Sequence, residues 1–128
     1  MDSNLKGLIK ILLVEDEIPV RLVTTRILQN AGYTVVSTQD GNEALNQYGL
    51  NPDTKLVIID YGLPGRKGPE VLKQFKARGY NGPAILSTGF GNSLDDRETA
   101  GFTTIVEKPL TAKKFIDAIE KTMQVVTA

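Results

Sequence analysis

Residues 9–17 read Ile-Lys-Ile-Leu-Leu-Val-Glu-Asp-Glu, an almost unbroken apolar run that ends in three acidic side chains. A second run, Leu56 to Ile59, is apolar throughout and is followed directly by Asp60. Continuous apolar runs of this length are typical of parallel strands that helices cover on both faces. Both runs therefore predict central strands, each with carboxylates where it ends.

The rest of the chain alternates between short apolar runs and helix-like segments. Further strands are predicted at residues 34–36, 84–86 and 104–106, and helices near Pro19, Asp40, Pro69, Ser93 and Thr111. The apolar positions of the first helix are Val20, Val23, Ile27 and Ala31. Asp40 and Glu43 have capping-box spacing ahead of the second helix, and Ser93 or Asp96 is the candidate cap of the fourth. Right-handed crossovers turn five such βα units into one doubly wound α/β sheet of the flavodoxin type, with helices on both faces and the order 2-1-3-4-5. We expect one domain over residues 1–128, its core at about 9–123, and no output domain.

The composition excludes several classes of function. The chain has 128 residues, 15 basic and 15 acidic side chains, and neither cysteine nor histidine. A net charge of zero gives no global positive field for nucleic acid or an anionic membrane, and no apolar stretch is long enough to span a bilayer. Thiolate chemistry, Ser-His-Asp triads and histidine-ligated zinc are excluded. We expect a soluble, cytoplasmic protein whose chemistry uses carboxylates, lysines, hydroxyls, backbone amides and a hard metal ion.

The predicted strand ends bring complementary groups to one place. Doubly wound sheets bind ligands at the carboxyl ends of their strands, where the strand order switches. With the order 2-1-3-4-5, Glu15, Asp16 and Asp60 converge there, and Lys108 follows the fifth strand. Three carboxylates against one lysine leave a negative charge that a divalent ion balances, and Mg²⁺ prefers such oxygen ligands. Ser87 and Thr88 supply hydroxyls at the end of the fourth strand.

These motifs together resemble the receiver domain of two-component response regulators. The resemblance covers about Ile9 to Met123 and rests on residues 11–17, 40–45, 56–60 with Pro64 and Gly68, 83–89 and 107–110. It implies that Asp60 is the phosphoacceptor, that Thr88 and Lys108 contact the phosphoryl group, and that Mg²⁺ is the cofactor. It also implies that Asp16 binds Mg²⁺ directly, Glu15 binds it through water, and the backbone carbonyl of Gly62 is a further ligand.

The family's function follows from the same resemblance. Asp60 would take a phosphoryl group from a phosphohistidine of a histidine kinase or phosphotransfer protein, so the chain would be a signalling module and not an enzyme with a separate substrate. Phosphorylation would change the surface of the fourth helix, fifth strand and fifth helix toward an unidentified downstream protein. The same face would pair two copies if the protein forms a homodimer.

Three positions depart from the family pattern. Ile105 stands three residues before Lys108, where many receivers carry an aromatic switch residue. Gly62 and Phe90 occupy the two places that tune the access of water to the acyl phosphate in the family. A β-branched side chain has few rotamers, so we expect a muted side-chain switch. Movement should instead concentrate in the glycine-containing loop 89–91 and in the polar segment 92–100.

Other functions are available to the same fold. A flavodoxin-like cofactor binder needs a Ser/Thr/Gly-rich phosphate loop after the first strand, where this chain has acidic residues that repel phosphate. A phosphatase of the haloacid-dehalogenase type needs a second Asp two residues after the nucleophile, where this chain has Gly62. A degenerate pseudo-receiver used only for protein contacts remains the alternative, disfavoured because the acid, threonine and lysine set is complete.

Overall fold

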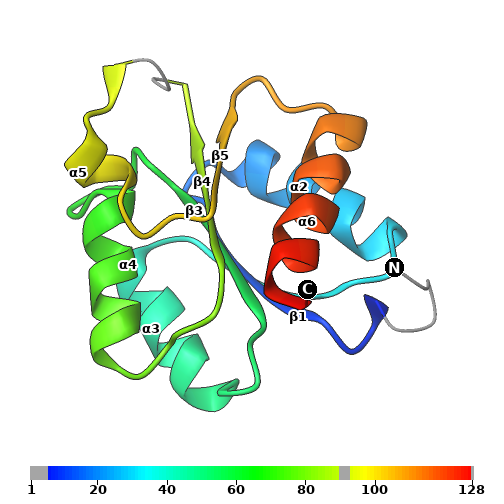
Figure 1. Ribbon diagram of the computed structural model, residues 1–128, viewed down its shortest axis with the longest axis horizontal. Coiled ribbons are helices and arrows are strands. Elements are labelled where there is room, and N and C mark those ends of the chain that lie inside the picture. Colours follow the sequence, from blue (N-terminus) through cyan, green and yellow to red (C-terminus); the bar gives the residue numbers. More distant parts are fainter. Residues whose placement is uncertain (1–5, 90–92, 128) are drawn as a thin grey trace.

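The computed structural model describes residues 6–89 and 93–127, and its strands form one parallel sheet in the order β2-β1-β3-β4-β5 (Figure 1). The strands are β1 (Lys10–Val14), β2 (Thr34–Thr38), β3 (Leu56–Asp60), β4 (Ala84–Thr88) and β5 (Thr104–Glu107). The helices are α2 (Ile18–Asn30), α3 (Gly41–Leu50), α4 (Gly68–Ala77), α5 (Asp96–Thr99) and α6 (Ala112–Thr127). The predicted fold class and strand order are confirmed. Phe90 and most of the loop 89–91 lie outside the described residues.

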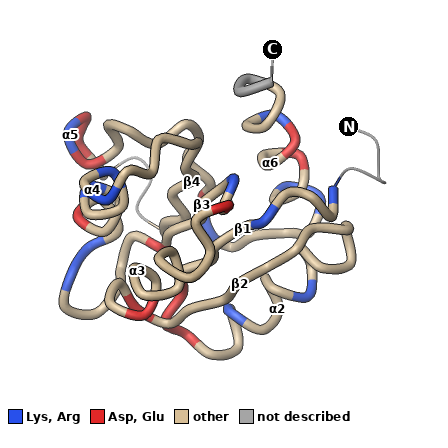
Figure 2. The backbone as a smooth tube through the Cα atoms, turned by 90° about the horizontal axis from the view of Figure 1, so that it is seen from below, with Lys and Arg blue, Asp and Glu red and all other residues tan. Residues whose placement is uncertain are grey.

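Helices cover both faces of the sheet. In two perpendicular views α3, α4 and α5 lie on one side of the strands, and α2 and α6 lie on the other (Figures 1 and 2). Alternate strand residues serve the two sides, so Leu12 and Val57 belong to the core under α4 while Ile11 and Ile58 belong to the core under α6. Burial of both faces explains why β1 and β3 read as continuous apolar runs.

The central strands extend further than their apolar runs. Asp60 is the last residue of β3 and pairs with Ser87, and Thr88 is the last residue of β4 and pairs with Glu107. The candidate phosphoacceptor is therefore held by the sheet itself and does not lie in the loop that follows.

The helix starts follow local capping chemistry. The Asp40 carboxylate accepts a hydrogen bond from the backbone N–H of Glu43 at 2.8 Å and caps α3, as the spacing predicts. α5 has only four residues and no buried ones, which fits the polar sequence of this segment. Its cap is Asp95, in a reciprocal capping box with Glu98, where the sequence suggested Ser93 or Asp96. Among the described residues no helix is long and apolar enough to span a membrane.

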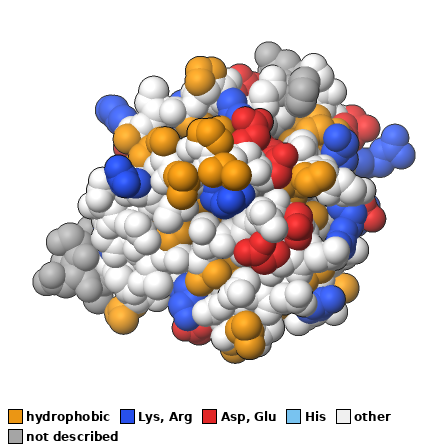
Figure 3. Space-filling view, turned by 180° about the vertical axis from the view of Figure 1, so that it is seen from behind, with side chains coloured by type: hydrophobic (Ala, Val, Ile, Leu, Met, Phe, Trp, Pro, Cys, Tyr) orange, Lys and Arg blue, Asp and Glu red, His pale blue; other side chains and the backbone are white. Residues whose placement is uncertain are grey.

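The buried face of α2 differs from the one that the sequence predicts. Its buried residues are Thr24 and Leu28, whereas Val23 is 60% exposed and Val20 and Ile27 are only half-buried. α2 has apolar residues around most of its circumference, and the sheet covers only the stripe through Thr24 and Leu28. Hydrophobic side chains consequently gather on the outer face of α2, beside acidic side chains (Figure 3). By contrast, basic and acidic residues are interspersed around the described chain (Figure 2).

Candidate functional site

Three carboxylates meet at the carboxyl edge of the sheet. β1 and β3 are neighbours with Val14 opposite Ile59, so the residues that follow Val14 lie beside Asp60. One carboxylate oxygen from each of Glu15, Asp16 and Asp60 lies within 4.8 Å of the others. Glu15 and Asp60 are buried and Asp16 is half-buried. The structure thus brings together the three acids that the sequence singled out.

Lys108 completes this cluster from the other side. Its Nζ lies 2.8 Å from Asp60 Oδ1 and 3.2 Å from Glu15 Oε1. Its backbone N–H donates to the carbonyl of Thr88 at 2.9 Å, which fixes the chain just after β5. Burial alone would lower the pKa of Lys108, but the hydrogen bond and charge of Asp60 and the charge of Glu15 raise that pKa above its usual value. The ammonium is therefore held in its charged form between two carboxylates.

The charged form of Glu15 is disfavoured by its place in the cluster. Burial raises the pKa of its carboxyl group above the usual value, and the negative charge of Asp60 raises it further. The backbone N–H of Glu17 and the Lys108 ammonium oppose this rise in pKa, because both stabilise the carboxylate form. One lysine does not neutralise three acids, so the site favours a further cation. Hard carboxylate oxygens at this spacing fit a divalent ion such as Mg²⁺.

A small cavity opens next to the carboxylates. It has a volume of about 280 Å³ and is lined by Glu17, Asp60, Tyr61, Gly62, Thr88, Gly89 and Lys108. Of the two hydroxyl residues that end β4, Thr88 lines this cavity and Ser87 does not. Gly62 also lines it, as the proposed carbonyl ligand must. The cavity gives a group bound at Asp60 room beside both a hydroxyl and an ammonium.

The loop after β3 depends on two glycines for different reasons. A Cβ on Gly68 would lie 2.6 Å from the backbone oxygen of Asp60, so only glycine allows α4 to begin this close to the site. Gly65 has a φ of 78°, which is a turn conformation that glycine favours. Gly62 has more space, since its added Cβ would meet nothing nearer than 3.8 Å. Close approach of the backbone is therefore the role of Gly68.

Two residues that the sequence did not single out also belong to the site. Tyr61 follows Asp60 directly, and its hydroxyl donates a hydrogen bond to Glu98 of α5. The Nζ of Lys67 lies 5.7 Å from the centroid of the Tyr61 ring. Arg21 of α2 donates to the backbone carbonyl of Glu15 at 2.9 Å and holds the acidic loop in place. An aromatic residue directly after Asp60 was visible in the sequence, but its partner 37 residues away was not.

Comparison with known proteins gives one family. Residues 11–120 match the response regulator receiver domain. The chain is 30% identical over 115 residues to sporulation initiation phosphotransferase F of Bacillus subtilis (strain 168), covering 88% of this chain and 91% of that protein. It is 31% identical over 121 residues to the phosphate regulon transcriptional regulatory protein PhoB of Escherichia coli (strain K12), covering 90% of this chain. The chain spans only about half of PhoB, 52% of its length.

A solved structure extends the likeness to the fold. The response regulator TrrA of Thermotoga maritima, solved in complex with Mg²⁺-BeF, superposes with a TM-score of 0.80 at 26% identity. The match covers 89% of this chain and 98% of that one.

Proposed function

This chain belongs to the response regulator receiver domain family, and from that premise we propose that it is a phosphoacceptor whose acceptor residue is Asp60. The observation that carries the proposal is the placement of Lys108 Nζ 2.8 Å from Asp60, within a cluster of three carboxylates. A pseudo-receiver used only for protein contacts has no need of this arrangement. The complete set of acids, threonine and lysine therefore favours phosphoryl transfer.

The proposed reaction uses groups that already surround Asp60. A carboxylate oxygen of Asp60 attacks the phosphorus of a phosphohistidine, and a P–O bond forms as the P–N bond breaks. The electron pair of that bond stays on the imidazole nitrogen, which takes up a proton. Lys108 and the Thr88 hydroxyl are placed to stabilise the charge on the phosphoryl oxygens. Attack by water on phosphorus later releases phosphate and restores the Asp60 carboxylate.

We assign the Mg²⁺ ligands from the same cluster. Asp16 and Asp60 would bind the ion directly, Glu15 through water, and Gly62 through its backbone carbonyl. Bound Mg²⁺ would neutralise charge on the oxygens of the transferred group. Burial raises the pKa of the Glu15 carboxyl group and the nearby charge of Asp60 raises it further, and a divalent ion among the three carboxylates would favour their charged forms. The TrrA structure with Mg²⁺-BeF is a neighbour of the same fold.

The phosphodonor would dock on the outer face of α2. An apolar groove of about 550 Å³ is lined by Pro19, Val20, Val23, Thr24, Ile27, Lys108, Pro109 and Leu110. Lys108 lines both this groove and the cavity at Asp60, so a protein seated in the groove reaches the acceptor. Ile18 and Leu22 extend the surface, with exposed fractions of 60% and 63%. The proposed occupant is an amphipathic helix of a histidine kinase or phosphotransfer protein.

The location of this chain in the cytoplasm remains a prediction.

Incubation with Mg²⁺ and acetyl phosphate tests the acceptor. Intact-mass spectrometry should show one added phosphoryl group, which is lost when Mg²⁺ is removed or in Asp60→Asn. Asp53→Asn is the matched control, because Asp53 is an exposed aspartate whose carboxylate pairs with Lys10 instead. Unchanged phosphorylation of Asp60→Asn would refute the assignment, and no phosphorylation of the unmodified chain by any donor would favour the pseudo-receiver.

A charge on α2 tests the docking surface separately. Leu22→Glu should slow phosphoryl transfer from a phosphorylated histidine kinase and leave the reaction with acetyl phosphate unchanged, since only the protein donor uses the groove. Leu50→Glu is the control, because Leu50 is 75% exposed at the end of α3. Equal effects of both substitutions on the kinase reaction would refute docking on α2.

A further inference from the structure

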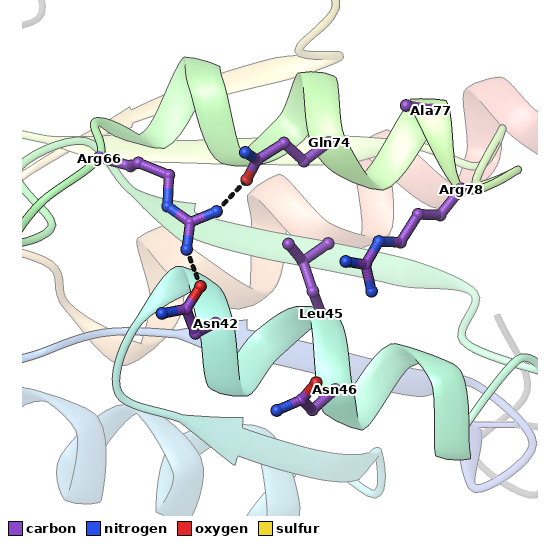
Figure 4. Close-up of a pocket in the computed structure, with 7 residues that line it drawn as sticks. All are labelled: Asn42, Leu45, Asn46, Arg66, Gln74, Ala77 and Arg78. Atoms are coloured by element: carbon purple, nitrogen blue, oxygen red, sulfur yellow. Dashed lines mark hydrogen bonds between the residues drawn. The ribbon is translucent and has the colours of Figure 1, made fainter.

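Another groove lies between α3 and α4 and is separate from both the carboxylate site and the groove on α2. It has a volume of about 470 Å³ and is lined by Asn42, Leu45, Asn46, Arg66, Gln74, Ala77 and Arg78 (Figure 4). Its lining shares no residue with the cavity at Asp60. Its size falls within the range of about 300–1,000 Å³ that is typical of small-molecule sites.

Arg66 is fixed at one end of this groove. Its guanidinium donates one hydrogen bond to Gln74 Oε1 of α4 and another to Asn42 Oδ1 of α3 (Figure 4). It also packs against the first turn of α3, because a Cβ on Gly41 would lie 3.5 Å from its Cζ. Both hydrogen-bond partners are neutral amides, and a guanidinium has five N–H donors. Arg66 is thus oriented by its neighbours, and neither of these two hydrogen bonds brings a negative charge to it.

Arg78 approaches the groove from the other end. It follows the last residue of α4, and its side chain extends toward Leu45 and Asn46 (Figure 4). Within residues 6–89 and 93–127, neither Arg66 nor Arg78 has a carboxylate within 4.0 Å, whereas Lys6, Lys10 and Lys113 each do. None of the seven lining residues is acidic. Two guanidinium groups therefore border one groove in which the described part of the chain places no carboxylate.

We propose that this groove binds a small phosphate-bearing molecule. Guanidinium groups recognise phosphate through paired N–H donors, and they suit this ligand better than a lysine does. The side-chain amides of Asn42 and Asn46 add neutral hydrogen-bonding groups along α3. Leu45 and Ala77 supply apolar surface against which the organic part of a phosphate ester packs. The proposal is independent of phosphorylation at Asp60.

ADP and inorganic pyrophosphate are suitable probes. Each would be titrated without Mg²⁺ into isotope-labelled protein, with the side-chain amide signals of Asn42, Asn46 and Gln74 followed by NMR. Saturable shifts with a dissociation constant of about 1 mM or tighter are expected. Tighter binding of ADP would identify an organic phosphate, and equal binding of pyrophosphate would identify the phosphate groups alone as the ligand.

Charge-removing variants separate this site from weak general anion binding. Arg66→Gln and Arg78→Gln should each weaken binding by about tenfold or more, the loss expected for a charge-assisted contact. Arg78 is exposed, so its variant tests the site even if Arg66→Gln alters the fold. Arg97→Gln is the matched control on α5, where the side chain is 95% exposed. Absence of saturable shifts, or equal affinity in the Arg78 and Arg97 variants, would overturn the proposal, and unchanged affinity in Asp60→Asn would support it.

Discussion

Replacement of Lys108 by methionine tests how the carboxylate cluster is held together. Methionine keeps an unbranched side chain of similar length and removes only the ammonium, so packing changes little. The substitution leaves Glu15 and Asp60 buried without their shared cation. We expect the domain to remain folded and to lose stability, most strongly when Mg²⁺ is absent.

The size of this loss follows from distance and burial. At an effective dielectric constant of about 20, contacts of 2.8 and 3.2 Å correspond to Coulomb attractions of about 6 and 5 kcal/mol before desolvation is subtracted. Removing one partner of a buried ion pair costs about 3–5 kcal/mol in other proteins. The Lys108 side chain is 25% exposed, which places it at the lower end, about 3 kcal/mol. That loss is smaller than the typical stability of a domain, about 5–15 kcal/mol.

Lys113→Met is the matched control for this experiment. Lys113 and Asp117 form an ion pair of 2.7 Å, but their side chains are 86% and 59% exposed. Water screens an exposed ion pair on one helix, so Lys113→Met should lose much less stability than Lys108→Met although the distances are alike. Urea unfolding would measure both losses, and Mg²⁺ should restore part of the stability of Lys108→Met only. Equal losses in the two variants would refute the argument from burial.

Three further predictions concern residues that support the fold and the site. Gly68→Ala should lose about 1–3 kcal/mol in urea unfolding because its Cβ would strike backbone, whereas Gly49→Ala, with open space around it, should lose nothing. Tyr80→Phe should lower the free energy of unfolding by about 1 kcal/mol at neutral pH, because it removes the hydrogen bond to the backbone carbonyl of Pro83. Burial raises the pKa of Tyr80, so this hydroxyl ionises at a lower pH in the unfolded chain than in the folded one. The stability of the wild-type protein therefore falls above about pH 10. The stability difference between the wild type and Tyr80→Phe should shrink in that range. Tyr61→Phe removes the hydrogen bond to Glu98 and should speed amide hydrogen exchange in α5. The variant should still accept a phosphoryl group at Asp60.

The sheet and the carboxylate cluster were predictable because strand ends in a parallel sheet share one edge. Apolar runs placed β1 and β3 in the middle, and the acids that follow them had to meet if the strand order was right. Local chemistry also predicted the cap of α3, because Asp40 and Glu43 are close in sequence. These inferences need only the periodicity of each element and the handedness of its connections.

The outer surfaces were not predictable in the same way. Periodicity showed apolar positions on α2 but could not say which stripe the sheet covers, and Val23 lies outside it. The groove between α3 and α4 joins Arg66 to Asn42, residues 24 apart whose meeting depends on how the loop after β3 folds back. Packing between distant elements decides both features, and no local pattern encodes it.

A contact between distant residues, which no local pattern predicts, also links the residue after Asp60 to α5. Ile105 of β5 pairs with Leu86 and is half-buried, and its branched side chain offers one favoured rotamer in place of an aromatic swing. Tyr61 is bonded covalently to Asp60, and its hydroxyl contacts Glu98, which also completes the cap of α5. We therefore expect a shift of the backbone at Asp60 to reach α5 through this hydrogen bond. None of the four residues of α5 is buried, so loss of the hydrogen bond should loosen this helix.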